Sequence, residues 1–96
     1  MADIVCQRVI PVDHPAFAGH FPGRAILPGV LLLAEVVEAL REDGQAGASM
    51  TISAAKFLAP VGPGAVLTIR VQEAGASRRF EVLQGEQRVA SGALGV

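Results

Sequence analysis

The residues best suited to chemistry in this chain are His20 and Gly29, which lie in and just after a loop rich in proline and glycine. An imidazole ordinarily titrates close to neutral pH, so His20 can accept a proton under cytosolic conditions. Gly29 follows Pro28 where an apolar segment begins. Backbone N–H groups at a helix start carry a partial positive charge, which stabilises a developing oxyanion. The pair therefore predicts a general base held against an oxyanion-binding amide.

Two carboxylates, Glu35 and Glu38, lie on the segment that follows Gly29 and are candidates for a catalytic acid. Together with Glu42 they fall at i, i+3 and i+7, which places them along one stripe of a helix. The same spacing is typical of a solvated stripe in which Arg41 pairs with Glu38. The residues alone leave both interpretations open.

The other reactive side chains favour structural roles. His14 precedes Pro15 and is expected to contribute turn or surface polarity. Cys6 is the single cysteine, so no internal disulfide can form, and its alternating segment predicts a small buried residue. With only two histidines, far from further cysteines, the sequence offers no zinc spacing, and no metal is expected.

Charge and hydropathy narrow the possible partners. Eight Lys and Arg residues stand against nine Asp and Glu residues, for a formal net charge of −1. No global field attracts nucleic acid or an anionic membrane, so any docking of an acidic partner must be local. No apolar run approaches the ~20 residues of a membrane span. The first residues have no signal-peptide pattern, which predicts a cytoplasmic location.

Hydrophobic periodicity predicts the elements that position these residues. Residues 3–10 predict a strand, and residues 28–43 a helix with almost no polar face over its first two turns, which must be covered nearly all round. The spacing of the apolar residues then changes to every second residue, which predicts strands at residues 50–58, 65–74, 78–84 and 87–96. We expect one α+β domain over residues 1–96, a curved antiparallel β-sheet wrapped around one long central hydrophobic helix, as in the hotdog fold. Its exposed edges predict a dimer that continues the sheet.

Two segments then resemble one family, the β-hydroxyacyl-ACP dehydratases (FabA/FabZ-like hotdog-fold proteins). The first is HPAFAGHFPGRAILPGVLLLAE, residues 14–35, and the second is AAKFLAPVGPG, residues 54–64. The agreement in the first segment covers Pro15, Phe17, Gly19, His20, Phe21, Pro22, Gly23, Ile26, Pro28, Gly29, Val30 and Leu31. The spacing between HFPG and PGVL is the most specific part of the resemblance.

The resemblance implies an acyl thioester substrate carried on the phosphopantetheine of ACP or CoA, with no cofactor. It implies active sites shared between two subunits, in a homodimer or higher homo-oligomer or with a hotdog hetero-partner. His20 is the implied base and Gly29 the implied oxyanion donor. The implied substrate contacts are Phe21, Pro22, Gly23, Pro28, Val30, Ala34 and Phe57. Carrier contacts are expected from Arg24 and Lys56, with Arg78 and Arg79 as further candidates.

The chain departs from this family at the catalytic acid. The family has a glutamate or aspartate fourteen residues after the histidine, and this position is Ala34 here. Glu35 lies one residue along, about 100° around a helix, and so points away from that site. Glu38 shares the face of Ala34 one turn further on. The family's N-terminal helix and first strand are also missing, and Leu58 and Ala59 replace a basic pair, so we expect a shorter or more open acyl tunnel and a less basic surface.

The expected function is a (3R)-hydroxyacyl-thioester dehydratase that eliminates water to give a trans-2-enoyl thioester, with His20 as base. A thioesterase is the alternative within enzymes, because Glu35 or Glu38 can activate water beside the same polarised carbonyl. A non-catalytic acyl-binding or accessory subunit is the alternative outside enzymes, and the alanine at position 34 motivates it.

Overall fold

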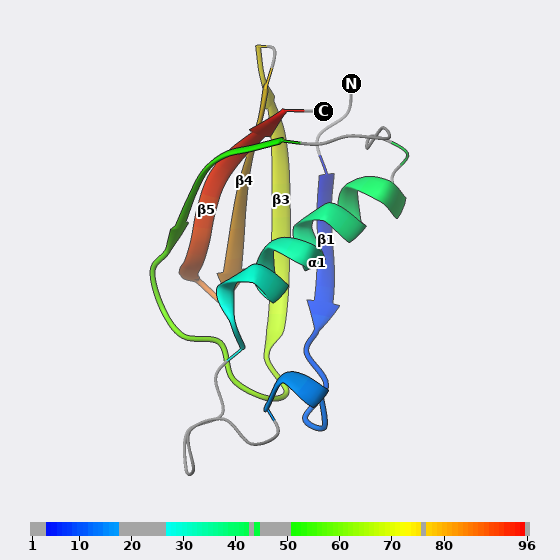
Figure 1. Cartoon of the computed structure of the whole chain (residues 1–96), viewed down its shortest axis with the longest axis vertical. Coiled ribbons are helices and arrows are strands. Elements are labelled where there is room, and N and C mark those ends of the chain that lie inside the picture. The colour runs from blue at the N-terminus through cyan, green and yellow to red at the C-terminus, as the bar shows by residue number, and fades with distance from the viewer. Residues whose placement is uncertain (1–3, 18–26, 43, 45–50, 76, 96) are drawn as a thin grey trace.

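The computed structural model of the chain describes residues 4–17, 27–42, 44, 51–75 and 77–95. Five strands and one α-helix make up the fold (Figure 1). In chain order the elements are β1 (Ile4–Val9), a 3₁₀ turn (Pro15–Phe17), α1 (Gly29–Glu42), β2 (Thr51–Phe57), β3 (Val66–Ala74), β4 (Ser77–Gln84) and β5 (Gln87–Gly95). Each strand and the helix lie within a residue or two of the bounds that periodicity predicts.

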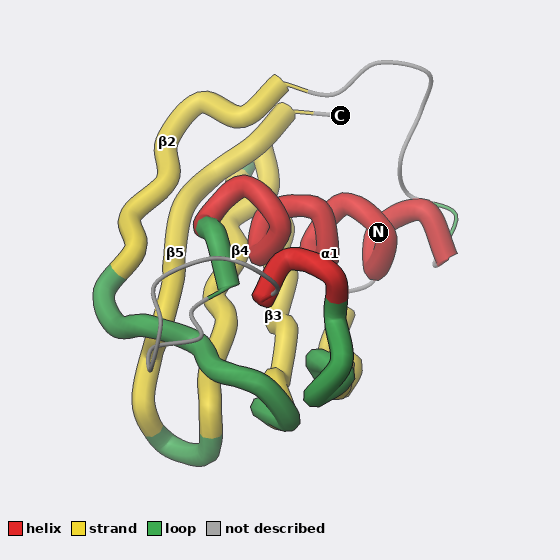
Figure 2. Tube along the Cα trace, turned by 60° about the horizontal axis from the view of Figure 1, so that its bottom comes forward, coloured by secondary structure: helices red, strands yellow, loops and turns green. Residues whose placement is uncertain are grey.

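The strands form one antiparallel sheet in the order β1-β3-β4-β5-β2. The sheet curves, and α1 lies across its concave face (Figure 2). Two tight turns connect β3 to β4 and β4 to β5, and their glycines, Gly75 and Gly85, have φ values of 65° and 62°. These left-handed conformations suit glycine, which explains why both hairpins turn where they do.

The core lies between α1 and the facing side of the sheet. On β3, Leu67, Ile69 and Val71 are buried while their neighbours face outwards, so the predicted alternation is confirmed. The helix contributes its own buried stripe, which consists of Leu32, Val36, Ala39 and Leu40. The leucine and valine side chains of this stripe each contribute about 1.5–3 kcal/mol by leaving water, so this interface holds the helix on the sheet.

The described residues cover the helix on one side, whereas the sequence predicts a helix covered nearly all round. Val30 is 71% exposed and Ala34 is also exposed, whereas Leu31 and Leu33 are half-buried. A single sheet can cover one face of a helix, and no second layer comes from the described residues. Over its first two turns the free face of α1 therefore presents small and apolar side chains, Val30 and Ala34, to any second subunit.

Strand β2 is the more exposed edge of the sheet. All seven of its residues are exposed, and apolar side chains such as Ile52 and Phe57 are among them. Among the described strands it pairs with β5 alone, with a register shift between Ile52 and Ala54. An unpaired edge of this kind offers backbone groups for pairing with another chain.

The residues around the 3₁₀ turn behave as the sequence predicts. The carbonyl of His14 accepts the N–H of Phe17 at 3.0 Å, and the two rings meet edge to face at 6.0 Å between centroids. Cys6 is half-buried against the core, which is less than the full burial expected.

The helices of the described part of the chain are all too short or too polar to cross a membrane.

Candidate active site

A pocket opens where α1 begins. It has a volume of about 570 Å³, within the range of small-molecule sites. Two chain segments line it, and the N–H of Leu27 ties them together by donating to the carbonyl of Val61 at 2.7 Å. The lining residues are Leu27, Pro28, Gly29, Val30 and Leu32 from the start of the helix, and Phe57, Leu58, Ala59, Pro60 and Val61 from the end of β2 onwards. Every one is apolar, so the pocket suits a hydrocarbon chain.

The backbone at the helix start supplies the polar groups of this pocket. The carbonyl of Pro28 accepts the N–H groups of Leu31 at 3.0 Å and of Leu32 at 3.3 Å, which closes the first turn. Among the hydrogen bonds that join described residues, none uses the N–H groups of Gly29 and Val30. First-turn amides have no acceptor within their own helix. They can therefore donate to a carbonyl oxygen, with the helix dipole favouring negative charge there.

The ring of Phe57 fixes the identity of residue 29. A Cβ added to Gly29 would lie 2.7 Å from Cζ of Phe57 and 2.9 Å from both Cε atoms. Such distances are shorter than van der Waals contact, so a side chain here would displace the ring. Gly29 thus allows close packing, and this packing also places its amide beside an aromatic wall of the pocket.

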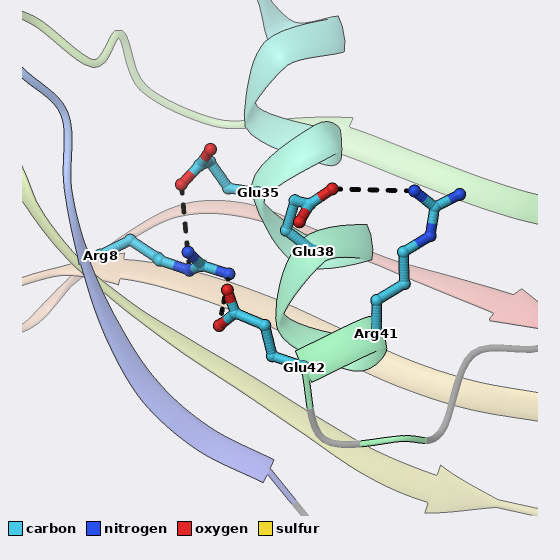
Figure 3. A network of polar contacts seen from close by, with 5 residues as sticks. All are labelled: Arg8, Glu35, Glu38, Arg41 and Glu42. Atoms are coloured by element: carbon cyan, nitrogen blue, oxygen red, sulfur yellow. Dashed lines mark ion pairs between the residues drawn. The ribbon is translucent and has the colours of Figure 1, made fainter.

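The two candidate carboxylates point elsewhere (Figure 3). Glu35 faces β1, where its Oε1 lies 4.0 Å from Nε of Arg8, and Glu42 binds the same guanidinium at 3.0 Å. Glu38 pairs with Arg41 at 3.7 Å on the exposed side of the helix, as its spacing predicts. Neither Glu35 nor Glu38 lines the pocket at the helix start. Ala34 is exposed and does not line it either.

The other expected site residues divide into two groups. Pro28, Val30 and Phe57 line the pocket together with Gly29. The loop residues of the motif lie outside the described residues, and their roles stay predictions; they are His20, Phe21, Pro22, Gly23 and Arg24.

The cationic residues that were expected to contact the carrier of the thioester fall into an exposed and a buried group. Lys56 and Arg79 are exposed. Arg78 is only 8% exposed and its Nη1 lies 3.4 Å from Oε1 of Glu73, so the expectation that it meets a carrier is wrong. The reason is the alternation of β4, which places Arg78 on the same face as the buried Phe80.

Sequence reasoning missed two features of this region. The sequence marks Leu58 and Ala59 only by the basic pair that they replace, whereas in the structure both residues line the pocket. Arg8 was not singled out, although it holds both Glu35 and Glu42. A contact between segments so far apart along the chain carries no local signal, because it depends on which strand passes under the helix. The described residues contain no group of three or more His, Cys, Asp or Glu that could hold a metal ion.

The comparisons with known proteins agree with this geometry. The model of the ApeI-like family, described as ApeI dehydratase, matches residues 1–93. The chain belongs to the ApeI-like dehydratase family. Its similarity extends to the 3-hydroxyacyl-[acyl-carrier-protein] dehydratase FabZ of Chlamydia trachomatis serovar L2, which is 34% identical over 106 residues. That match covers 95% of this chain and 69% of the relative.

Solved structures share the hotdog fold of this ApeI-like chain. The dehydratase heterocomplex ApeI:P from Xenorhabdus doucetiae superposes with a TM-score of 0.77 at 21% identity, over 97% of this chain and 85% of that one. The fluoroacetyl-CoA-specific thioesterase FlK superposes with a TM-score of 0.68 at 15% identity, over 97% and 88% of the two chains. At these identities the structures establish the fold.

Proposed function

We propose that this chain is the subunit of a dehydratase that removes water from a 3-hydroxyacyl thioester and leaves a trans-2-enoyl thioester. The observation that carries the proposal is the apolar pocket that ends at the amides of Gly29 and Val30. An acyl chain fills the pocket, and the thioester carbonyl accepts a hydrogen bond from Gly29. Membership of a dehydratase family supports the same reaction.

The chemical step needs a base that acts on the carbon next to the carbonyl. His20 takes that proton, the electron pair moves into the carbonyl, and the oxyanion is stabilised at Gly29. The electrons then form the double bond as the 3-hydroxyl leaves with a proton, so one water is released. The resemblance assigns Phe21, Pro22 and Gly23 to substrate contact, and Pro28, Val30 and Phe57 line the pocket that takes the acyl chain.

The acid that protonates the leaving hydroxyl comes from a second hotdog subunit in this proposal. Glu35 is held by Arg8 and Glu38 by Arg41, and position 34 has no carboxyl group. Ala34 lies on the free face of α1, where a second subunit can pack, and β2 offers an open sheet edge. The relative ApeI of Xenorhabdus doucetiae is found in a heterocomplex, which supports a mixed assembly here.

The carrier of the thioester is ACP or CoA, and the reaction needs no metal or other cofactor. Thioester hydrolysis is the competing reaction, but it needs a carboxylate that activates water in the pocket, and neither helix glutamate lines it. The test is to incubate the purified chain with 3-hydroxyacyl-ACP and with 3-hydroxyacyl-CoA and to separate products by mass. A parallel reaction adds a homologous hotdog subunit that has the glutamate missing at position 34. Enoyl thioester is expected when this partner is present. Free acid without enoyl thioester would overturn the proposal in favour of a thioesterase, and the absence of enoyl thioester with the partner present would overturn it as well.

A further inference from the structure

The face of the sheet opposite α1 carries a hollow of about 580 Å³ that the proposed reaction does not use (Figure 1). Half of the lysine and arginine side chains of the chain line this hollow, and they are Lys56, Arg70, Arg79 and Arg88. Glu81 is the single carboxylate among its lining residues. Four cations against one carboxylate leave the hollow an excess of three positive charges, whereas the whole chain has a formal net charge of −1.

The register of the strands brings cations from both sides of β5 together. Lys56 on β2 pairs with Ser91 on β5, and Arg79 on β4 pairs with Ala93 on β5. Cross-strand partners project to the same side of a sheet, and neighbouring strands lie about 4.8 Å apart. Lys56 and Arg79 therefore flank β5, whose small side chains at Ser91 and Ala93 form the floor between them. Both long side chains can reach one ligand above this floor.

An irregularity in the sheet adds Arg88 to the same face. The register between β4 and β5 shifts beside this residue, and Val89 and Ala90, which follow it, are both buried. Arg88 consequently projects outwards, where its Nη2 lies 3.0 Å from Oε2 of Glu81. Bulges in a sheet often re-aim a side chain next to a functional site.

The four cations differ in how far their charge is already balanced. Glu81 lies between Arg88 and Arg70, with a distance of 3.7 Å to Nη1 of Arg70, and compensates part of the charge of both. Lys56 and Arg79 form no ion pair with the residues that the structure describes. Both are exposed, so they are the groups most able to bind an anion from solution.

We propose that the hollow binds a free polyphosphate anion, of the kind that nucleoside diphosphates and triphosphates carry, as an effector and not as a substrate. Guanidinium groups bind phosphate oxygens through paired hydrogen bonds, and a lysine adds a point charge. The excess of three positive charges suits an anion with several charges better than a single carboxylate. The neutral donors Gln72 and Ser91 also line the hollow, and its volume lies within the range of small-molecule sites.

The ligand acts on the acyl pocket through β2. All seven residues of this strand are exposed, and among the described strands it pairs with β5 alone. A polyphosphate bound to Lys56 and Arg79 joins β2 to β4 and so restrains the strand. Phe57 directly follows Lys56, and its ring packs against Gly29 in the acyl pocket. An effect on turnover rests on the proposed function, whereas the binding itself does not.

The first experiment measures binding without any thioester. Inorganic tripolyphosphate is titrated calorimetrically into the full chain, into Arg79→Gln, into the double variant Lys56→Gln/Arg79→Gln, and into the matched control Arg41→Gln. The control removes the same charge from an exposed arginine on the helix. We expect the double variant to bind at least ~10-fold more weakly than the native chain, Arg79→Gln to lie between them, and the control to bind as the native chain does. High salt should weaken binding to the native chain.

Three results overturn the assignment of the hollow. The first is a native chain that does not bind tripolyphosphate, and the second is equal affinity of the native chain and the double variant. The third comes from a parallel titration with free CoA, which also carries a diphosphate. Tighter binding of CoA than of tripolyphosphate, lost in the double variant, assigns the hollow to the thioester and not to an effector.

The second experiment follows hydrogen exchange of the amides of residues 51–57 with and without tripolyphosphate. We expect the ligand to slow their exchange at least ~3-fold in the native chain and to leave it unchanged in the double variant, because β2 is then joined to β4. Binding without slower exchange contradicts the link to the acyl pocket. Binding with slower exchange, in a chain that forms no enoyl product, supports the effector site while the dehydratase proposal fails.

Discussion

The ring of Phe57 packs directly against Gly29, so closely that a Cβ at position 29 would lie 2.7 Å from its tip. The contact joins the end of β2 to the start of α1, two segments that lie far apart in the sequence. It places an aromatic wall of the acyl pocket beside the amide that is proposed to bind the thioester oxygen. Access to that amide therefore depends on the position of the ring.

The substitution Gly29→Ala tests this packing. We expect the methyl group to push the ring out of place, destabilising the fold by about 1–3 kcal/mol. Turnover should fall by more than ~10-fold as the oxyanion site is distorted. Chemical denaturation and steady-state kinetics measure the two effects. Gly95→Ala is the matched control, since a Cβ there meets no atom within 4 Å.

A smaller side chain at position 57 should relieve this clash. In the double variant Gly29→Ala/Phe57→Leu we expect stability to recover by at least half of the loss, because the ring that occupies the methyl position is gone. Unchanged losses in the double variant would mean that residue 29 is constrained by something other than Phe57.

The pairing of Glu35 with Arg8 predicts that this glutamate stabilises the fold and takes no part in the reaction. Glu35→Gln should lower the free energy of unfolding by about 0.5–1 kcal/mol, because a half-exposed ion pair is lost. Turnover should change by less than ~3-fold, since the side chain does not line the pocket. Glu86→Gln, in the exposed turn after β4, is the control. A loss of turnover of ~100-fold with stability intact would make Glu35 the acid.

Position 34 offers a gain-of-function test of the missing acid. Ala34→Glu should raise dehydration by at least ~10-fold, because it places a carboxyl group on the free face of α1 where a second copy of the chain can use it. Ala34→Gln has the same shape without the acid and should give no increase. If both variants behave as the native chain while remaining folded, the acid comes from elsewhere and the assignment of position 34 fails.

Particular residues show which parts of the fold and of the site can be predicted from the sequence. The alternation of Leu67, Ile69 and Val71 and the helical spacing of Leu32 and Val36 are local signals, and they predict the strands and helix almost to the residue. The helix start at Gly29 likewise follows from the Pro28–Gly29 pair that precedes the apolar segment. Such features need only the residues beside them.

The remaining features depend on contacts between distant segments. Arg8 forms an ion pair with Glu35 because β1 passes under α1. Phe57 contacts Gly29 because the sheet curves. The register likewise aligns Lys56, Ser91, Glu81 and Arg70 across four strands, which no window of sequence contains. The exposure of Val30 likewise depends on tertiary packing, because the described residues leave it uncovered.

The most direct test of the central claim is the effect of His20→Ala on the formation of enoyl thioester from 3-hydroxyacyl-ACP, measured by mass in the Ala34→Glu background. The account predicts that enoyl product falls by at least ~1,000-fold while the unfolding transition is unchanged, because the base is lost and the pocket remains. Enoyl product formed at an unchanged rate would remove His20 from the mechanism and contradict the account.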